Sequence, residues 1–386
     1  MKRVLQISNY QYPHIGGIEQ VARDIADALS EIDGIEQKMI CFNEDAGDGD
    51  YICHRKETVH DEVDGIEVIR CGCITKVASQ SISMTYNREL KRVFNEFQPD
   101  IVIFHYPNPF VAHFLLKYKK RDFKLALYWH LDITKQKTMK KLFHGQNLAL
   151  IRRADYILGA TPIHLNQSEF SAEFGDKKYV LPYMIDERKL VLSEEEKREA
   201  ELLREKHKGE KIGFFIGRHV PYKGLKYLVE ASAKLTETKI HFYIAGQGEL
   251  TDELKKLAKD DPKIEFVGRI SDSQRRIFQQ ACDIVCFPSI TRNEAFGLAL
   301  AEGMYFGKPA VTFHIDGSGV NYVNLDGVTG IECSNGDTGA YAAALDKLCA
   351  DRELYEEYGK NARQRVLDNF TVESFKTNVK KFIMTA

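Results

Sequence analysis

Short runs of aliphatic and β-branched residues alternate along the chain with segments whose apolar residues recur at helical spacing. Because the short runs lack the strict alternation of a strand with one wet face, each is predicted to be a strand buried on both faces. In the first half of the chain these strands occupy residues 4–8, 101–105, 124–130 and 156–160. The helical segments between them occupy residues 18–30, 87–97, 110–119 and 139–153. Strand–helix alternation predicts a parallel, doubly wound sheet.

The alternation stops after LPYMID, residues 181–186, and restarts beyond a highly charged stretch at residues 194–211. In the second half the predicted strands occupy residues 212–216, 240–245, 264–267, 284–287 and 310–313. The predicted helices occupy residues 224–235, 249–259, 272–282, 297–306 and 338–349. The chain is therefore expected to form two doubly wound α/β domains that face a cleft, with ligands beyond the carboxyl ends of the strands.

Two other segments extend this pattern. Residues 43–65 are acidic and rich in glycine, and they are predicted to be a loop that leads into a strand at residues 66–71. Residues 371–386 are predicted to form a final helix that carries Phe375, Val379 and Phe382 on one face.

Composition narrows the class of protein. A length of 386 residues suits two domains of about 150–200 residues each. A net charge of −2 gives no basic field, so nucleic acid is not expected as a partner. The eight cysteines lack the spacing of a zinc site or a disulfide framework. No apolar stretch approaches the ~18–20 residues that cross a bilayer, so we expect a cytoplasmic protein with reduced thiols.

Two cations lie at a predicted strand-to-helix junction in GRHVPYKG, residues 217–224. Arg218 and Lys223 fall between the end of the strand and the start of the helix. A guanidinium can hold a phosphate through two hydrogen bonds, and a helix N-terminus attracts anions. The segment therefore predicts an anion site, and a surface loop with two solvated charges is the alternative.

The loop after the first strand, HIGGIEQ at residues 14–20, contains the paired glycines Gly16 and Gly17. Paired glycines let a backbone approach a ligand closely and present free N–H groups to it. The pattern is not the GxGxxG fingerprint of a nicotinamide site, and an ordinary tight turn is the alternative.

A histidine marks the end of one buried strand. His130 lies in YWHLDITKQK, residues 128–137, where the strand reaches its carboxyl end. Side chains at that end of a parallel strand are placed to meet a ligand, although a lone histidine is also often a structural residue. Both interpretations stay open from the residues alone.

Two glutamates flank a helix start in NEAFGLALAEG, residues 293–303. Glu294 comes just before a helix that begins near Gly297, and Glu302 lies about one and a half turns into it. At roughly 10 Å apart along the segment, the two carboxylates are too distant to share a proton. They are predicted to contact different parts of one long ligand, with the unpaired N–H groups of the helix start between them. A helix cap and a solvated helix face are the alternative.

In this order, the motifs resemble the retaining glycosyltransferases of family 4, which have the GT-B fold. The resemblance runs along nearly the whole chain. It rests on GGIE, GRHVPYKG, IAGQGEL at residues 244–250, VGRI at residues 267–270 and the two glutamates separated by seven residues. YWHLDITKQK is further similar to the subgroup that builds bacterial lipopolysaccharide and capsule repeat units, mannosyltransferases among them.

The resemblance implies a division of labour between two Rossmann-like domains. An acceptor-binding domain would span residues 1–183, with residues 368–386 crossing back to pack on it. A domain that binds a nucleotide-diphosphate sugar would span residues 184–367.

The resemblance also implies a role for each candidate side chain. Arg218 and Lys223 would clamp the donor's diphosphate. Glu294 would hold a donor-sugar hydroxyl, typically the 3-OH, and Glu302 would accept hydrogen bonds from the ribose hydroxyls. His130 would touch the region of the sugar's 6-OH.

Backbone groups would complete the donor site. Gly16 and Gly17 would approach the phosphates, and the amides between the two glutamates would approach the sugar and the phosphates. The base would meet the backbone near the VGRI motif. The residues implied are Ala295, Phe296, Gly297 and Leu298 for the sugar–phosphate end, and Gly268 and Ile270 for the base.

No cofactor and no metal ion are expected, because two cations and helix-terminal amides would neutralise the leaving diphosphate, GDP or UDP. Asp48-Gly49-Asp50 resembles the metal motif of the other glycosyltransferase fold, but it lies in a polar loop with no strand before it. The chain has Asn321 where the family usually has a glutamate, and Asn321 can still cap a helix. Because no carboxylate is placed beneath the anomeric carbon, front-face attack is expected.

On the acceptor side, residues 135–153 form a basic amphipathic segment, which suits a lipid-diphosphate acceptor at the inner face of the membrane. An ordinary solvated helix face is the alternative. Its basic residues are Lys135, Lys137, Lys140, Lys141, Arg152 and Arg153, and its apolar residues are Leu142, Phe143, Leu148 and Leu150.

The sequence thus predicts a retaining, metal-independent hexosyltransferase that uses a nucleotide-diphosphate sugar and a glycan or lipid-linked acceptor in cell-surface polysaccharide synthesis. The subgroup resemblance favours GDP-mannose as donor, and a UDP-hexose is the alternative. A sugar-nucleotide 2-epimerase would share the fold. A non-catalytic sugar-binding protein is the alternative from a different class.

Overall fold

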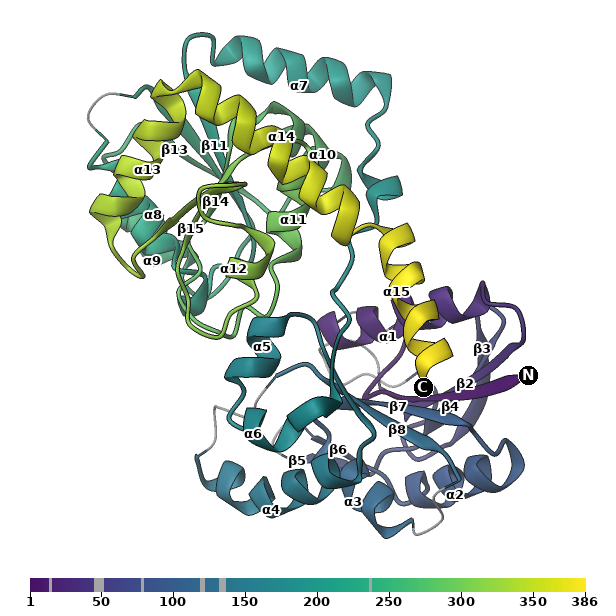
Figure 1. Ribbon diagram of the computed structural model, residues 1–386. Helices are drawn as coiled ribbons and strands as arrows, with labels where there is room; N and C mark the ends of the chain where they lie inside the picture. Colours follow the sequence, from purple (N-terminus) through teal and green to yellow (C-terminus); the bar gives the residue numbers. More distant parts are fainter. Residues whose placement is uncertain (14–15, 45–51, 78–79, 119–121, 132–136, 236–237) are drawn as a thin grey trace. The chain divides into compact units, whose positions relative to one another are not determined.

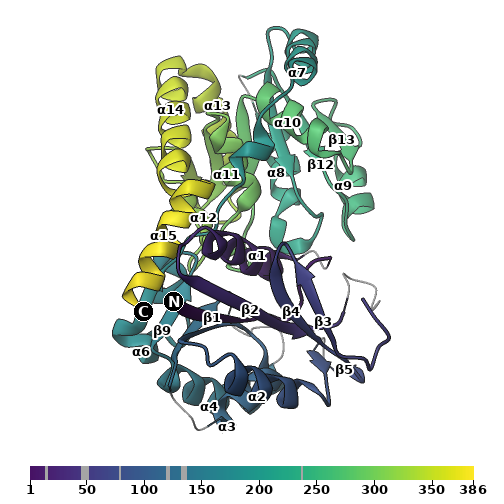
Figure 2. The same ribbon diagram turned by 90° about the vertical axis from the view of Figure 1, so that its right-hand side faces the viewer.

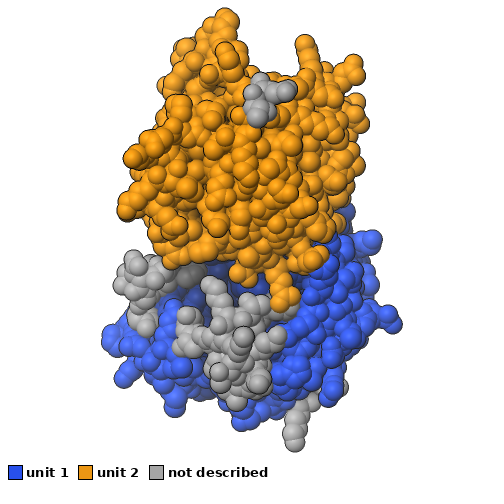
Figure 3. Space-filling model, turned by 90° about the vertical axis from the view of Figure 1, so that its left-hand side faces the viewer, with its two compact units in different colours: residues 1–181, 375–386 blue, residues 182–374 orange. Residues whose placement is uncertain are grey.

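The computed structural model describes residues 1–13, 16–44, 52–77, 80–118, 122–131 and 137–235, and then 238–386. For residues 137–142 it describes the backbone alone. The chain divides into two compact units, one of residues 1–181 with 375–386 and one of residues 182–374 (Figure 3). The sequence placed the same boundaries at residues 183 and 368.

Unit 1 is built on an eight-stranded sheet of order β10-β9-β8-β7-β1-β2-β4-β3. Every neighbouring pair is parallel except β3 and β4. The strands are β1 (Lys2–Ile7), β2 (Ile35–Phe42), β3 (Val59–Val63), β4 (Ile66–Cys71), β7 (Ile101–Tyr106), β8 (Lys124–Trp129), β9 (Tyr156–Gly159) and β10 (Lys178–Val180). A separate hairpin pairs β5 (Thr75–Val77) with β6 (Gln80–Ile82).

Helices cover both faces of this sheet, as the alternating pattern predicts. Helix α1 lies on one face, and α2, α3 and α4 lie on the other (Figures 1 and 2). All six residues of β7 are buried, which confirms a strand covered on both sides. The helices are α1 (Gly17–Ser30), α2 (Tyr86–Glu96), α3 (Pro109–Lys117), α4 (Lys137–Arg153), α5 (Pro162–Gln167) and α6 (Ser171–Phe174), followed by the 3₁₀ turn η1 (Gly175–Lys177).

The last helix, α15 (Val372–Thr385), returns the end of the chain to unit 1. Lys2 Nζ donates to the carbonyl of Ile383 over 2.8 Å, and the Lys376 ammonium lies 2.5 Å from a carboxylate oxygen of Glu31. The Phe382 ring packs against the ring of Tyr156 at 5.4 Å. The predicted return of the final helix to the first domain is confirmed.

Unit 2 is built on a six-stranded parallel sheet of order β13-β12-β11-β14-β15-β16. Helices α10 and α11 lie on one face, and α8, α9 and α13 lie on the other (Figure 1). The strands are β11 (Lys211–Ile216), β12 (Ile240–Ala245), β13 (Ile264–Gly268), β14 (Ile284–Phe287), β15 (Ala310–Phe313) and β16 (Gly330–Cys333). The helices are η2 (Glu187–Leu190), α7 (Glu194–Lys206), η3 (Pro221–Lys223), α8 (Leu225–Ser232), α9 (Thr251–Leu257), α10 (Asp272–Ala281), α11 (Leu298–Tyr305), α12 (Val320–Val323), α13 (Thr338–Ala350) and α14 (Arg352–Asn369).

Each sheet has one point where the strand order reverses. In unit 2 the chain adds β12 and β13 to one side of β11, and β14 then pairs with the other side of β11. In unit 1 the same reversal falls between β1 and β7. Ligands of doubly wound sheets bind beyond the carboxyl ends of the strands at such a point, so a ligand site is expected at the loops there.

The observed elements differ from the predicted ones at several places, and strand β2 of the unit 1 sheet is among those that were not predicted. Residues 43–65, predicted to be a loop, contain the edge strand β3. The charged stretch at residues 194–211 contains α7, which begins with a capping box between Ser193 and Glu196. Helix α14 was not predicted, because Arg352–Asn369 carries few apolar residues and buries a narrow face.

Glycine is required where the strand ends of unit 2 meet. Gly246, after β12, has a φ of +112°, and a Cβ there would lie 1.9 Å from the carbonyl oxygen of Gly217. We expect Gly246→Ala to lower the free energy of unfolding of unit 2 by about 3 kcal/mol or more, through strain and overpacking together.

Chemical unfolding followed by circular dichroism measures this effect. Gly209→Ala is the matched control, because Gly209 has a φ of +84° and open space around its Cβ position. The only tryptophan, Trp129, lies in unit 1, so its fluorescence reports that unit separately. Equal losses in the two variants would contradict the steric account.

Candidate functional site

The candidate site of unit 2 is formed by the loops that follow β11 and β14, the two strands at the reversal point. The first loop contains Arg218 and Lys223, and the second leads to Glu294. Because β11 and β14 are neighbours in the sheet, their carboxyl ends bring these loops together. The predicted strand-to-helix junctions are confirmed on both sides.

The two predicted cations differ in their surroundings. Arg218 is exposed, and its side chain makes no hydrogen bond or ion pair with any described residue. The Lys223 side chain is only 12% exposed. Its ammonium lies 5.0 Å from the centre of the Phe287 ring, within cation–π range. Arg218 is thus available to a ligand, whereas Lys223 is held in place by the protein.

A close turn fixes the position of Lys223. It ends η3, and Gly224 then adopts a φ of +63° before α8 begins. A Cβ on Gly224 would lie 2.0 Å from the carbonyl oxygen of Pro288, so the first loop packs directly on the second. The glycine of the GRHVPYKG motif therefore permits the close approach of the two loops.

Lys223 and Glu294 form an ion pair that joins the two loops. The distance from Lys223 Nζ to Glu294 Oε2 is 2.5 Å, and each side chain is 12% exposed. The Ser289 hydroxyl donates to the same carboxylate over 3.1 Å. The Ser318 hydroxyl donates to the backbone carbonyl of Glu294 over 2.5 Å. The sequence predicted separate contacts for Lys223 and Glu294 and did not predict that they touch.

The start of α11 presents unpaired backbone donors beside this pair. Gly297 precedes the helix with a φ of +92°. Leu300 and Ala301 donate their N–H groups to the Gly297 carbonyl. Within the described chain, the N–H groups of residues 295–298 donate to no protein group. The helix start therefore combines uncommitted donors with the positive end of a helix dipole, which favours a negatively charged ligand group.

Glu302 lies inside α11, with 16% of its side chain exposed. Its carboxylate accepts hydrogen bonds from Arg275 Nη1 at 2.9 and 3.1 Å and from Gln279 Nε2 at 3.2 Å. Burial raises the pKa of Glu302 above its ordinary value, although the Arg275 charge opposes the shift. The two carboxylates thus have different partners: Glu294 pairs with Lys223, and Glu302 accepts hydrogen bonds from side chains of α10. They form no pair that shares a proton.

The predicted base contacts lie after β13. Gly268 ends this strand with a φ of +71°, and its carbonyl accepts from the N–H of Gly246 over 2.7 Å. The Ile270 side chain packs against the apolar cluster around Phe214 and Tyr243. The Ile270 side chain is half-buried there, and the base contact predicted for this residue is through its backbone.

The loop after β15 borders the same site, and it corrects one expectation. Asn321 lies within the short helix α12, and Gly319 holds the capping position. The Asn321 amide accepts from the N–H of Ile315 over 2.9 Å and donates to the carbonyl of Phe313 over 3.1 Å. Asn321 therefore braces this loop internally and is not a helix cap.

The sequence did not single out a polar pocket of about 630 Å³ beside the Glu294 loop. At its rim, His314 Nδ1 lies 3.1 Å from Glu332 Oε2, a hydrogen bond that raises the pKa of His314. No sequence signal joins these two residues, because they come together only through the pairing of β15 with β16. The pocket is lined by Ile290, Thr291, Arg292, His314, Ile315, Asp316, Asp326, Glu332, Cys333, Ser334 and Asn335.

The candidates of unit 1 follow two strands of its sheet, Gly16 and Gly17 after β1 at the reversal point and His130 after β8. Gly16 precedes α1, and a Cβ on Gly17 would meet nothing within 4 Å, so this backbone is openly accessible. His130 follows β8 and is 3% exposed. Its Nε2 lies 3.0 Å from Nδ1 of His105. The strand-end position predicted for His130 is confirmed, and a ligand can reach only a small part of its ring.

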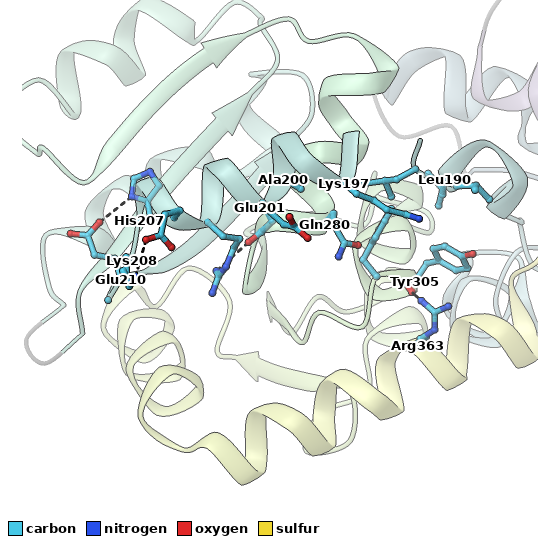
Figure 4. A pocket seen from close by; sticks show the side chains of 17 residues that line it. Leu190, Lys197, Ala200, Glu201, His207, Lys208, Glu210, Gln280, Tyr305 and Arg363 are labelled. Atoms are coloured by element: carbon cyan, nitrogen blue, oxygen red, sulfur yellow. Dashed lines mark hydrogen bonds and ion pairs between the residues drawn. The ribbon is translucent and has the colours of Figure 1, made fainter. Parts of the chain in front are cut away.

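A larger cavity, of about 820 Å³, lies elsewhere in unit 2 (Figure 4). It is bounded by α7 and by the ends of α10 and α11. Figure 4 shows Lys197 and Glu201 on α7 and, across the cavity, Arg363, whose Nη1 donates to the Tyr305 carbonyl over 2.6 Å. None of the candidate residues lines this cavity, so its size does not make it the candidate site.

The basic amphipathic segment is described only in part, because residues 132–136 and the side chains of 137–142 lie outside the description. Arg152 is exposed. Arg153 donates to the carbonyls of Leu115 and Tyr118, so it stabilises the end of α3. Asp48-Gly49-Asp50 also lies outside the described residues. No described helix is long and apolar enough to cross a membrane.

Two family models match the chain. A model described as Glycosyl transferases group 1 matches residues 194–365, and one described as Glycosyltransferase Family 4 matches residues 15–166. The first range contains every candidate residue of unit 2. The second contains Gly16, Gly17 and His130.

Curated relatives match along nearly the full length. The chain is 28% identical over 378 residues to O-antigen chain mannosyltransferase C of Escherichia coli, covering 96% of this chain and 95% of the relative. It is 29% identical over 383 residues to D-rhamnosyltransferase WbpZ of Pseudomonas aeruginosa, covering 96% of this chain and 92% of the relative.

Solved structures share the fold. Sucrose-phosphate synthase from Thermosynechococcus elongatus superposes with a TM-score of 0.77 at 17% identity, covering 100% of this chain and 99% of that one. Anabaena HepE in complex with UDP and glucose superposes with a TM-score of 0.71 at 17% identity, covering 100% of both chains. The predicted architecture of two Rossmann-like domains, GT-B, is confirmed.

Proposed function

The chain is a glycosyltransferase of the GT-B fold, and on that premise we propose that it is a retaining, metal-independent hexosyltransferase. It would use a nucleotide-diphosphate sugar as donor and a glycan or lipid-linked sugar as acceptor, in the synthesis of a cell-surface polysaccharide. The observation that carries the proposal is the 2.5 Å pair of Lys223 and Glu294 beside the exposed Arg218 and the unpaired amides of residues 295–298.

This pair suits the bond that the reaction breaks. Lys223 is assigned to the diphosphate and Glu294 to a sugar hydroxyl, and the two side chains touch. In a nucleotide sugar, the anomeric carbon lies where the sugar meets the diphosphate. A donor that contacts both residues therefore has its anomeric C–O bond close to the pair, next to the positive start of α11.

Bond breaking moves negative charge onto the leaving diphosphate. Lys223 and the amides of residues 295–298 would stabilise that charge, because the protein holds them in place before the reaction, and the exposed Arg218 would add a second cation. The bond between the anomeric carbon and the leaving phosphate oxygen would break, and the acceptor oxygen would bond to the anomeric carbon on the same face. The acceptor's hydroxyl proton would pass to the leaving phosphate, so that no protein carboxylate is needed as nucleophile.

Retention and metal independence can each be tested directly. NMR of the product should show the same anomeric configuration as the donor, and excess EDTA should leave the initial rate unchanged. An inverted product would overturn the front-face step, and a loss of activity on chelation that added metal restores would overturn the metal-independent step.

The donor is proposed from the relatives, whose names include a mannosyltransferase and a rhamnosyltransferase. A thermal-shift panel of GDP-mannose, other GDP-sugars and UDP-hexoses should show the largest rise in Tm with GDP-mannose. A larger rise with a UDP-hexose would favour the alternative donor class. Assays with labelled donor separate the remaining functions: a 2-epimerase changes the sugar without an acceptor, and a binding protein releases no nucleotide.

The environment of Glu302 predicts a pH dependence of donor binding. Its pKa is raised by burial, and its charged carboxylate is the better acceptor for the ribose hydroxyls. As pH falls through this raised pKa, the carboxylate is protonated, so donor affinity should decline at a higher pH than an ordinary glutamate would cause.

Calorimetric titration of donor between pH 5 and 8 tests this prediction. Glu302→Gln, which cannot titrate, should bind more weakly and lose this acid limb. An unchanged limb in that variant would assign the limb to another group. The raised pKa of Glu302 also makes the free energy of unfolding depend on pH. The contribution of this group to stability is fully present below its pKa in the unfolded chain, and it is lost as pH rises through its pKa in the folded protein.

A further inference from the structure

A buried hydrogen-bonded chain lies behind His130 in unit 1. His130 Nε2 lies 3.0 Å from His105 Nδ1, and His105 Nε2 lies 3.0 Å from Gln6 Oε1. The three residues come from neighbouring strands of the sheet, Gln6 from β1, His105 from β7 and His130 from the end of β8. Gln6 is 1% exposed and His105 0% exposed, so water does not compete for these contacts.

Ring stacking restricts the orientation of both imidazoles. The His105 and His130 rings are inclined by 13°, with their centres 5.3 Å apart. Tyr128 stacks on His130 at 4.3 Å and on His105 at 5.8 Å. Rotation of either ring out of this stack would break a buried hydrogen bond. The stack fixes the plane of the ring, and the hydrogen bond to His105 keeps Nε2 of His130 directed at that residue.

Both imidazoles are neutral at physiological pH, because burial lowers the pKa of His105 to about 3 and that of His130 well below its ordinary value. A neutral imidazole has one donor and one acceptor nitrogen. The oxygen of Gln6 faces His105, so His105 carries its proton on Nε2 and its Nδ1 is an acceptor. The His130 nitrogen that faces this acceptor must then carry the proton.

We propose that Gln6 and His105 are positioning residues that hold His130 in the tautomer with its proton on Nε2 and its lone pair on Nδ1. This proposal rests on the proposed glycosyltransferase function and on the role that the family resemblance implies for His130, which is contact with the donor sugar. An Nδ1 lone pair accepts a hydrogen bond and cannot donate one. A hydroxyl can donate to such a lone pair, whereas an ionised phosphate or carboxylate oxygen cannot.

NMR tests the tautomer without any substrate. In protein with ¹⁵N-labelled histidine, long-range ¹H–¹⁵N spectra distinguish the two neutral tautomers, and loss of signals in His130→Gln assigns those of His130. We expect the proton of His130 on Nε2. A proton on Nδ1 would overturn the proposal, since it would mean that the Gln6 amide is reversed and every donor in the chain is inverted.

Kinetics test whether the chain matters for transfer. His105→Phe keeps an aromatic ring for the stack and removes both hydrogen bonds, whereas His105→Asn can place an amide oxygen near the position of Nδ1. We expect His105→Phe to lower kcat by about 10-fold to 100-fold, by analogy with the loss of the hydrogen-bond partner of a metal-binding histidine. His105→Asn should recover most of that loss and restore the tautomer.

Donor KM should change little in both variants, because the nucleotide is assigned to unit 2. Circular dichroism and Trp129 fluorescence establish that each variant folds. If folded His105→Phe keeps kcat within twofold, or if His105→Asn restores the tautomer without improving kcat, the positioning role is wrong. If the wild type transfers no sugar from any donor, the proposed function fails, and the NMR spectrum still decides the tautomer.

Discussion

Replacement of Lys223 by alanine is expected to lower kcat for sugar transfer by about 10²–10³, because a preoriented cation on the departing charge is lost. The Lys223 side chain is 12% exposed, and its ammonium is fixed by Glu294 and by the Phe287 ring, so a mobile solvent cation cannot take its place with the same geometry. Steady-state kinetics with saturating donor and acceptor measure the effect.

Two further variants make this test specific. Lys223→Met keeps most of the side-chain volume on Phe287, and it should lose as much activity as Lys223→Ala if charge is what matters. Lys226→Ala removes an exposed lysine in the following helix and should leave kcat unchanged. If Lys223→Met transfers sugar within a few-fold of the wild-type rate, the assignment of Lys223 to the diphosphate is wrong.

Stability has to be measured in the same variants. Without Lys223, the Glu294 carboxylate keeps the hydrogen bond from the Ser289 hydroxyl. It loses its ion pair with Lys223, the only one it makes with a described residue. Loss of one partner of a partly buried ion pair leaves the other charge uncompensated, so some loss of folding free energy is expected. Because kcat is a property of the folded, saturated enzyme, a lower Tm with normal kcat would also contradict the assignment.

Replacement of Glu302 by alanine is expected to raise the donor KM by about 10-fold to 100-fold, which corresponds to the loss of a charge-assisted hydrogen bond. The ribose is remote from the bond that breaks, so its binding is similar in the ground and transition states and kcat should change little. Measurement of kcat and KM against donor concentration separates the two effects.

The control takes account of Arg275, which loses its partner on α11 when Glu302 is removed. Glu302→Gln keeps an oxygen for Arg275 and lacks the charge, and Glu357→Ala removes an exposed carboxylate from α14. We expect an intermediate KM for the first and a normal KM for the second. A collapsed kcat with unchanged KM in Glu302→Ala would contradict the ribose assignment.

The position of the site loops could be predicted from sequence, because they follow short apolar runs that end at Gly217 and Pro288. Their contact could not be predicted in the same way. Lys223 touches Glu294 because β11 and β14 are neighbours, and strand order is not encoded in local hydrophobic periodicity. The hydrogen bond from Arg275 to Glu302 could not be predicted for the same reason, because it depends on the packing of α10 against α11.

Other differences have local causes that the sequence did contain. The capping box between Ser193 and Glu196 is a sequence signal for the start of α7. The helix was nevertheless not predicted, because the segment is rich in charged residues and has only a narrow apolar face. His105 is a polar residue inside the otherwise apolar run IVIFHY, a signal for a buried polar contact. Its partners His130 and Gln6 could be identified only from the sheet order β8-β7-β1.

The central claim is that the loops after β11 and β14 hold the donor's diphosphate and sugar. A crystal structure of the chain with a nucleotide-diphosphate sugar tests this claim most directly. We predict the diphosphate within hydrogen-bond distance of Arg218, Lys223 and the amides of residues 295–298, with a sugar hydroxyl on Glu294. A diphosphate bound elsewhere, for example in the cavity beside α7, would contradict the account.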